Sequence, residues 1–250
     1  MNSLLFSKVI CLDQSKSTND DAFAVLEKAP SCLVWTTDQT AGRGSRGRGW
    51  LSPAGCHLAL TLAFDANGFP APGELCYPLL AGVAVYDTLR QLNPKAPLSL
   101  KWPNDVMLSG LKCAGILCES RWVRDQVRIA IGIGINLKSH PSLAGLPKGY
   151  AALASLPQPP APVQIIDALK TIFAKTLADH TRPETLNKAW LLRSGLPVGT
   201  PLRIKANGAT LEGSFAGLDQ DGALMLWDAQ QHVHRIAQSC DDFDILPSLG

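Results

Sequence analysis

The sequence predicts an α/β domain followed by a small all-β domain, with a boundary near residue 195. Residues 126–137 alternate between large apolar and small or polar side chains, which is the period of a strand. Residues 73–92 repeat apolar side chains at helical spacing. After residue 195, short strand-like runs are separated by Asn-Gly and Asp-Gly turn signals, which indicate a small barrel or sandwich. We therefore expect domains at 1–194 and 195–250.

The composition is that of a globular protein. The 250 residues suit one large domain with a small companion, and 46% of them are hydrophobic. A net charge of +2 gives no general reason to bind nucleic acid or an anionic membrane. Any preference for anions must therefore be local.

The cysteine pattern predicts free thiols in a reducing, cytoplasmic location. The seven cysteines are odd in number and form no Cys-x-x-Cys pair, which disfavours a disulfide framework and a zinc site. Lys8 interrupts the short apolar run at the N-terminus, so a signal peptide is not expected. No segment approaches the roughly 20 apolar residues of a membrane-spanning helix.

The first domain is expected to alternate strands with helices. The apolar runs predict strands at 4–12, 32–37, 57–64, 98–102, 111–119 and 126–137. A first helix should follow Ser17-Thr18-Asn19 and end before Pro30, because all three residues favour N-caps and two acids follow them. On local evidence these three residues cap the helix, but a helix N-terminus can also present hydroxyls and N–H groups to a ligand.

Further helices are expected at 73–92, where Pro94 ends the pattern, and at 150–156, 163–180 and 184–194. In the second domain the strands are expected at 201–205, 210–216, 223–227 and 233–237.

Residues 39–50 form the most unusual stretch, with four glycines, three arginines and no acid. Glycine resists ordering, and the guanidinium groups repel one another. Glycines let backbone N–H groups approach a ligand, and arginine matches phosphate or carboxylate oxygens. The stretch is therefore either a solvated basic loop or an anion-binding loop.

Two further positions carry polar groups at strand ends. Pro103 should stop a strand, so that Asn104-Asp105 forms a turn, and Asp105 could face Mg²⁺ on a nucleotide. An ordinary turn is the alternative. Lys112 opens the next strand and is either solvated or part of a site.

Gly132 and Gly134 lie in mid-strand, where glycine costs stability. They leave space either for a ligand against the backbone or for a closely packed helix. The sequence does not decide between these two explanations.

In this order along the chain, four stretches resemble a biotin–protein ligase: 42–50, Lys101-Trp102-Pro103-Asn104-Asp105, 112–117 and Gly132-Ile133-Gly134-Ile135-Asn136. Each motif is weak alone, and the ordered set is specific. Members of this family join biotin to ATP as biotinyl-5′-adenylate, release pyrophosphate and pass biotin to a lysine of a biotin carboxyl carrier domain.

The resemblance implies a mixed sheet flanked by helices, of the class II synthetase-like kind, with a small SH3-like β-barrel at the C-terminus. It implies ATP with Mg²⁺ and biotin as the small molecules. The partner would be a carrier domain of a biotin-dependent carboxylase, and the protein would be a monomer or homodimer.

The resemblance also implies site residues. It gives catalytic roles to Lys112 and Arg43. Biotin and its adenylate would contact Ser17, Thr18, Asn19, Gln39, Gly42, Arg43, Gly44, Ser45, Lys112, Gly115, Gly132 and Gly134. The nucleotide would contact Arg46, Arg48, Trp50, Asn104, Asp105 and Asn136, with Asp105 also facing the metal.

The sequence departs from the family pattern in three places. Position 45 is Ser where the family usually has Arg, which suggests weaker retention of the adenylate. The chain starts directly in the catalytic domain, without the helix-turn-helix of bifunctional members, so DNA binding is not expected. The stretch 240–243 is more acidic than the family leads us to expect, so no role is transferred to it.

Three alternatives remain to be weighed. A lipoate or octanoate ligase or transferase shares the catalytic architecture. An RNA-binding Arg-Gly module is disfavoured, because the run is single and the chain is nearly neutral. His232 and His234 share a strand face and could bind a metal, but no third ligand is evident.

Overall fold

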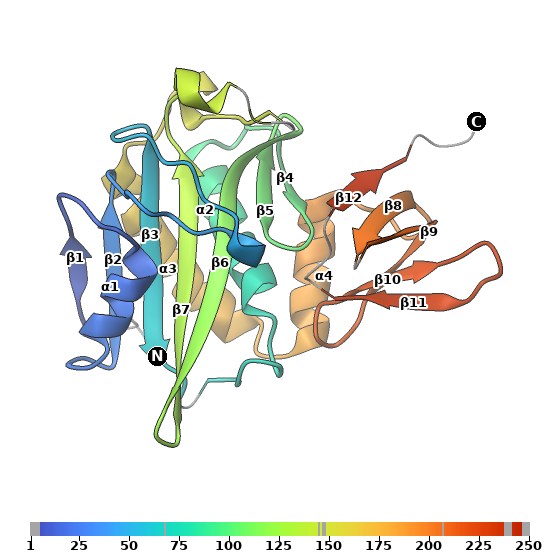
Figure 1. Ribbon diagram of the computed structural model, residues 1–250, viewed down its shortest axis with the longest axis horizontal. Coiled ribbons are helices and arrows are strands. Elements are labelled where there is room, and N and C mark those ends of the chain that lie inside the picture. The colour runs from blue at the N-terminus through green and yellow to red at the C-terminus, as the bar shows by residue number, and fades with distance from the viewer. Residues whose placement is uncertain are drawn as a thin grey trace.

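The structure is a computed structural model that describes residues 6–67, 69–144, 146, 149–206, 208–237 and 242–246, without the side chains of Arg46, Ala206 and Asp242. It contains two β-sheets joined through a layer of helices (Figure 1). No helix in this described part of the chain is long and apolar enough to cross a membrane.

The larger sheet has the strand order β1-β2-β3-β7-β6-β5-β4. Its first two strands are parallel and the other neighbours are antiparallel, so the sheet is mixed. Its strands are β1 (Val9–Cys11), β2 (Ser31–Thr36), β3 (His57–Asp65), β4 (Leu98–Lys101), β5 (Asp105–Leu108), β6 (Leu111–Val123) and β7 (Gln126–Asn136).

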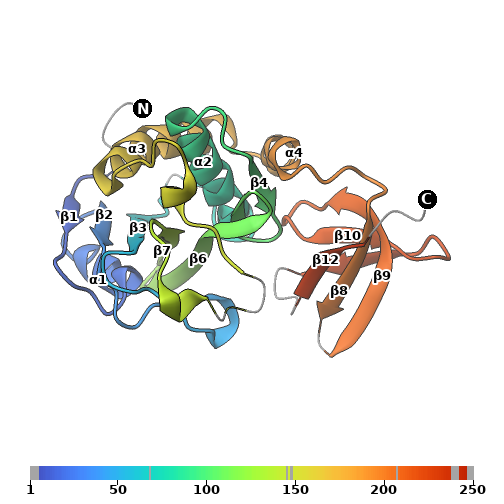
Figure 2. The same ribbon diagram turned by 90° about the horizontal axis from the view of Figure 1, so that it is seen from above.

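Helices cover both faces of this sheet, as expected. α2 and α3 lie on one face and α1 lies on the other (Figure 2). The helices are α1 (Thr18–Val25), α2 (Tyr77–Leu92), α3 (Pro162–Asp179) and α4 (Pro183–Ser194), and short 3₁₀ turns are η1 (Ser45–Gly47), η2 (Pro141–Leu143) and η3 (Leu153–Ser155).

The core lies between the large sheet and the α2–α3 layer. β3 is buried over almost its whole length, as its nearly continuous apolar run predicts. β7 turns Ile129, Ile131, Ile133 and Ile135 into this core. The small residues of β7 therefore face the opposite side, where α1 and the loop after β2 lie.

The second sheet follows α4 and has the order β11-β10-β9-β8-β12, with all described pairs antiparallel. Within the described residues it is open, because β11 and β12 lie at opposite edges, so a closed SH3-like barrel is not confirmed. Its strands are β8 (Pro201–Ala206), β9 (Ala209–Leu218), β10 (Leu224–Trp227), β11 (Val233–Ile236) and β12 (Asp242–Ile245).

Several expected boundaries were wrong. The expected helix at 73–92 begins at Tyr77, the first helix ends at Val25 rather than near Pro30, and 150–156 contains only the turn η3. β5 was not expected: Asp105 begins a strand that pairs back on β4, because Pro103 ends one strand of a hairpin rather than the sheet. β12 was also missed, because this short segment is defined as a strand by its pairing with β8.

Candidate functional site

A cavity of about 560 Å³ lies above β6 and β7, under the loop that follows β2, and reaches the second sheet. This volume is typical of small-molecule sites, which span about 300–1,000 Å³. The expected site residues that line it are Ser17, Thr18, Asn19, Gln39, Arg43, Gly44, Ser45, Arg48, Trp50, Asn104, Asp105, Lys112, Gly115, Gly132, Gly134 and Asn136.

Two expected residues stand apart from this set. Gly42 is not among the lining residues; a Cβ there would meet the Gln39 amide and the Trp50 carbonyl at 2.8 Å, so its role is close backbone packing. The backbone of Arg46 lies in η1, and its side chain lies outside the described part of the structure.

The floor of the cavity is a pair of glycines on neighbouring strands. Gly115 of β6 and Gly134 of β7 lie directly opposite each other. The Trp50 indole packs on both: a Cβ would meet the ring at 2.9 Å from Gly115 and at 2.6 Å from Gly134. The Trp50 indole N–H is buried and has no hydrogen-bond partner among the described residues.

Gly132 has a different neighbour. A Cβ there would collide with the amide of Asn19, which comes from α1. Of the two explanations left open by the sequence, the closely packed helix is confirmed at Gly132, where Asn19 of α1 approaches, whereas Gly134 accommodates the Trp50 side chain of the loop. A ligand against the backbone stays a prediction.

The α1 end of the cavity is polar. Ser17 is the N-cap of α1, but its side chain makes no capping hydrogen bond. The cap comes instead from Gln39, whose Oε1 accepts from the Thr18 backbone N–H at 2.9 Å. Among the described residues, the Ser17 hydroxyl and the Gln39 amide nitrogen make no hydrogen bond, so both can bind a ligand.

Asn19 is held on both sides of its amide. The Thr61 hydroxyl donates to Asn19 Oδ1 at 2.6 Å, and Asn19 Nδ2 donates to Glu119 Oε2 at 2.7 Å. Both Asn19 and Thr61 are buried. Neither Thr61 nor Glu119 was expected at the site, because each lies within an apolar strand and carries no motif.

The arginine loop folds back on itself and is held by carboxylates. The Trp50 N–H donates to the Gly42 carbonyl at 2.8 Å. Arg43 forms ion pairs with Asp20 at 2.5 Å and with Glu119 at 3.0 Å. The hydrogen bond from Arg43 lowers the pKa of the Asp20 carboxyl, and the hydrogen bond to Asp20 raises the pKa of Arg43.

The other end of the cavity holds an ion pair. Lys112 Nζ lies 2.5 Å from Asp105 Oδ1 and 5.3 Å from the centroid of the Trp50 ring. Asn104 donates to the Ile116 carbonyl at 2.7 Å, and Asn136 donates to the Ala151 carbonyl at 3.1 Å. Each of these two amides therefore uses at least one N–H to hold the backbone around the cavity.

Basic side chains outnumber acidic ones along the described lining. The lining includes Arg43, Arg48, Lys101 and Lys112, and Asp105 is its acidic residue. The chain as a whole has a net charge of only +2, so this excess of basic side chains is a local feature of the cavity. Arg43 and Lys112 are ion-paired with carboxylates, which an anionic ligand would replace. A cavity of this charge favours an anionic ligand.

Sequence reasoning missed two lining residues of particular interest, Lys101 and Phe243. Lys101 Nζ lies 5.6 Å from the Phe243 ring centroid, and Trp102 packs beside the same ring. Lys101 stood in a quoted motif and could have been found there. Phe243 could not, because it comes from β12 of the second sheet.

The described residues contain no cluster of three or more His, Cys, Asp or Glu side chains that could hold a metal ion. His234 and His232 instead contact the Asp228 carboxylate, at 2.8 Å and 3.4 Å. The hydrogen bond from His234 lowers the pKa of Asp228 to about 2. The alternative of a metal site on these two histidines is therefore not supported within this part of the chain.

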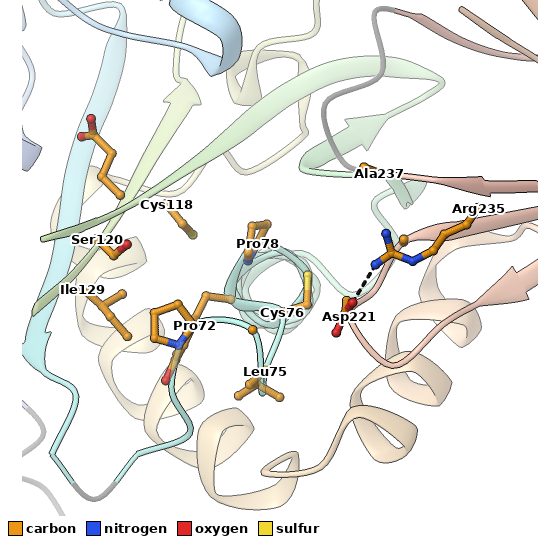
Figure 3. A pocket seen from close by; sticks show the side chains of 14 residues that line it. Pro72, Leu75, Cys76, Pro78, Cys118, Ser120, Ile129, Asp221, Arg235 and Ala237 are labelled. Atoms are coloured by element: carbon orange, nitrogen blue, oxygen red, sulfur yellow. Dashed lines mark hydrogen bonds and ion pairs between the residues drawn. The ribbon is translucent and has the colours of Figure 1, made fainter. Parts of the chain in front are cut away.

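A second cavity, of about 340 Å³, lies beside the start of α2, between β6 and the second sheet (Figure 3). Its basic residue, Arg235, is paired with Asp221 at 2.6 Å and with Asp219. Burial raises the pKa of the Cys118 thiol, which also lines it. Because Glu119 and Asp221 outnumber Arg235 in its described lining and its thiol is kept neutral, this cavity is less suited to an anion.

Comparison with known proteins points in one direction. A model of the biotin/lipoate A/B protein ligase family matches residues 9–136. The chain is 35% identical over 227 residues to a biotin–[acetyl-CoA-carboxylase] ligase from Paracoccus denitrificans, covering 86% of this chain and 92% of the relative. It is 31% identical over 201 residues to the bifunctional ligase/repressor BirA of Bacillus subtilis, covering 78% of this chain and 61% of BirA.

The fold is also similar to a solved structure. A biotin protein ligase from Aquifex aeolicus, in complex with biotin and ATP, superposes with a TM-score of 0.76. The match covers 96% of this chain and 100% of that one, at 20% sequence identity. This likeness concerns the architecture.

Proposed function

Since this chain belongs to the biotin/lipoate A/B protein ligase family, we propose that it is an ATP-dependent biotin–protein ligase. It joins biotin to AMP as biotinyl-5′-adenylate, releases pyrophosphate, and transfers biotin to a lysine of a biotin carboxyl carrier domain. The observation that carries this proposal is a single cavity with a polar end, a glycine floor and an excess of basic side chains.

The polar end suits the uncharged head group of biotin. The Ser17 hydroxyl and the Gln39 amide supply donors for a ureido carbonyl, and Thr18 and Asn19 complete this end. Gly115, Gly132 and Gly134 shape the floor of the biotin site by letting Trp50 and Asn19 pack close to the strands, and Gly42 and Gly44 shape the loop above.

The basic side chains suit the reacting groups. Bringing a carboxylate to a polyphosphate places negative charges together, and Arg43 and Lys112 offset them where the new bond forms. Ser45 lies beside the same groups, and Arg48 extends the positive charge toward the triphosphate. The family resemblance of the sequence gives Arg46 the same role. Fixed cations at the α-phosphate stabilise the charge that develops as pyrophosphate leaves.

Trp50, Asn104 and Asn136 form the wall on the nucleotide side. Magnesium bound to ATP takes most of its ligands from phosphate oxygens and water and commonly one or two from protein carboxylates. Asp105 is the acidic residue in the described lining and would supply one such carboxylate. When bound, the metal neutralises phosphate charge. Holding both substrates in one cavity also removes part of the entropic barrier, at best about 7–11 kcal/mol.

The catalytic domain spans 1–194 and the second domain 195–250. The left-handed Gly195 at the end of α4 supports this boundary. We propose that the second domain is SH3-like, a small curved sheet that contributes Phe243 to the cavity.

The proposed partner is the carrier domain of a biotin-dependent carboxylase, with the ligase a monomer or homodimer. The small net charge of +2 supports a partner other than nucleic acid. A cytoplasmic location rests on the cysteine pattern of the sequence; Cys11, Cys32, Cys56, Cys76, Cys113 and Cys118 are free thiols.

The test is pyrophosphate release that depends on both biotin and ATP, comparing wild type with Lys112→Ala. Removing a cation that stabilises the developing charge should slow the reaction by about a hundredfold or more. Octanoate and lipoate in place of biotin identify the preferred acid. Release that needs no biotin, or that Lys112→Ala leaves unchanged, would contradict the proposal.

A further inference from the structure

We propose that Glu119 is a positioning residue that couples the two halves of the cavity, holding Asn19 at the head-group end and Arg43 in the arginine loop with one carboxylate. The inference rests on the proposed function for its substrate, biotin. It adds a residue that lies inside β6 and outside the described lining of the main cavity.

The first half of the argument is the contact with Asn19. Glu119 Oε2 accepts from Asn19 Nδ2 at 2.7 Å, while Thr61 donates to the opposite end of the amide at 2.6 Å. With both ends engaged, the Asn19 amide has one orientation. Its oxygen faces Gly132 and Thr61, and its nitrogen faces β6.

The second half is the contact with Arg43. Both Glu119 oxygens accept from Arg43 Nη2, at 3.0 Å and 3.3 Å. Asp20 accepts from the same guanidinium and also from Arg121 Nη2 at 2.8 Å. Arg43 is therefore held by carboxylates from two elements, α1 and β6.

Exposure separates the two carboxylates. The Arg43 and Asp20 side chains are 40% and 47% exposed, so solvent screens that pair strongly. The Glu119 side chain is 32% exposed and its partner Asn19 is 5% exposed, so the charge-assisted bond between these two is screened less. Asp20 touches only the loop side of the network, whereas Glu119 touches both sides.

The contact has a consequence for binding. Glu119 fixes Asn19 and Arg43 with one carboxylate, so a ligand that contacts Asn19 meets the Arg43 guanidinium held in one place by the same group. Head-group recognition and charge neutralisation are thereby linked without a change of fold.

The experiment compares Glu119→Gln with Asp20→Asn. Trypsin cleavage after Arg43, followed by mass spectrometry of the fragments, reports the grip on the loop and needs no substrate. Isothermal titration with biotin, with and without the non-cleavable analogue α,β-methylene-ATP, reports the head-group end and its coupling to the nucleotide. Glu119→Asp, a shorter carboxylate, is measured in the same way.

Both neutral variants should be cleaved faster than wild type. Glu119→Gln alone should weaken biotin binding, by about tenfold, because it alone removes a charge-assisted bond to Asn19. It should also lose the effect of the nucleotide analogue on biotin affinity. Glu119→Asp should fall between wild type and Glu119→Gln.

Equal biotin affinity in Glu119→Gln and wild type overturns the inference, as does equal biotin affinity in Glu119→Gln and Asp20→Asn. If Glu119→Gln does not fold, Glu119→Asp decides, and wild-type values in both assays overturn the inference. If wild type itself binds no biotin, both the proposed function and the proposed role of Glu119 in holding Asn19 for the head group are contradicted. The trypsin result then still decides the Arg43 half.

Discussion

At the scale of single residues, the N-terminus of α1 illustrates how a capping residue is released for another task. Ser17 occupies the N-cap position but leaves its hydroxyl unused, because Gln39 caps the Thr18 N–H from the neighbouring loop. The loop residue Gln39 therefore caps α1, and the Ser17 side chain lines the cavity. Local propensity at Ser17 predicted a cap, and tertiary structure provided a different one.

Ser45 offers a direct test of adenylate retention. Its hydroxyl accepts a hydrogen bond from Arg48 Nη2 at 3.3 Å. The Ser45 side chain lines the cavity but carries no charge. We expect Ser45→Arg to slow the escape of biotinyl-adenylate, because a guanidinium adds a charge-assisted bond to the phosphate. The measurement is the rate at which free adenylate labels lysines of a bystander protein.

Ser45→Ala serves as the control, because it removes the hydroxyl and adds no charge. Equal labelling rates for wild type and Ser45→Arg would show that position 45 does not retain the adenylate.

Gly134 tests the floor of the cavity. A Cβ at this position would lie 2.6 Å from the Trp50 ring, so Gly134→Ala must displace the indole. We expect kcat/KM for pyrophosphate release to fall by up to about a hundredfold, because misplacing a group in the site by about 1 Å is that costly.

Gly82→Ala is the matched change elsewhere. Gly82 lies in α2, where a Cβ would make ordinary contact with Leu100 at 3.7 Å. Alanine there should raise stability by about 1 kcal/mol and preserve activity. Comparable activity in the two variants would mean that Trp50 packing is unimportant.

At the scale of elements, β6 and β7 combine two functions in one hairpin. One face packs isoleucines into the core, and the other gives up side chains at Gly115, Gly132 and Gly134 so that a helix and a loop can approach. The strand period that predicted β7 also predicted which residues share the open face. Asn19 and Trp50, which occupy that face, lie at least 65 positions away in the chain from the glycines they cover.

β3 begins with a buried histidine that makes the protein sensitive to pH. Burial holds the pKa of His57 below its ordinary value of 6.5, while Nδ1 donates to the Pro53 carbonyl at 3.0 Å. The unfolded chain binds more protons at this position than the folded one, so the free energy of unfolding falls as the pH drops through 6.5.

We therefore expect wild type to unfold at lower urea concentration at pH about 5.5 than at pH about 7.5, and His57→Gln to show a smaller difference between the two. If His57→Gln keeps the full wild-type difference, the pH sensitivity originates elsewhere.

At the scale of the whole molecule, the second sheet is joined to the first beside the cavity. Trp102 Nε1 donates to the Gly222 carbonyl at 3.0 Å, and Asn187 of α4 donates to the Asp219 carbonyl at 2.7 Å. Phe243 packs beside Trp102 and reaches the cavity wall. The position of the second sheet therefore affects the shape of the nucleotide end.

Trp102→Phe removes the donor and keeps most of the ring. We expect it to lower the free energy of unfolding by about 1–3 kcal/mol, because a buried carbonyl loses its partner. Urea denaturation measures this. Trp122→Phe is the control, since Trp122 is 75% exposed and should change stability by less than about 0.5 kcal/mol. Equal stability losses in the two variants would argue against the inter-sheet bond.

Much of the architecture followed from the sequence because periodicity is a local property. β7, α3 and α4 lie close to where apolar spacing, prolines and Gly195 placed them. β5 and β12 were missed, because each is defined by its pairing partners, which are β4 and β6 for β5 and β8 for β12. The site motifs were likewise visible, since glycines, arginines and Lys112 are unusual within their own segments.

The sequence by itself determined most of the segments that form strands and helices, and which residue types could meet an acid and a nucleotide. Tertiary structure alone decided how those residues pair: Trp50 on Gly134, Asn19 over Gly132, and Arg43 between two carboxylates. These contacts join residues far apart in the chain. Their geometry depends on how the sheet, α1 and the loop pack together, and no local pattern encodes that packing.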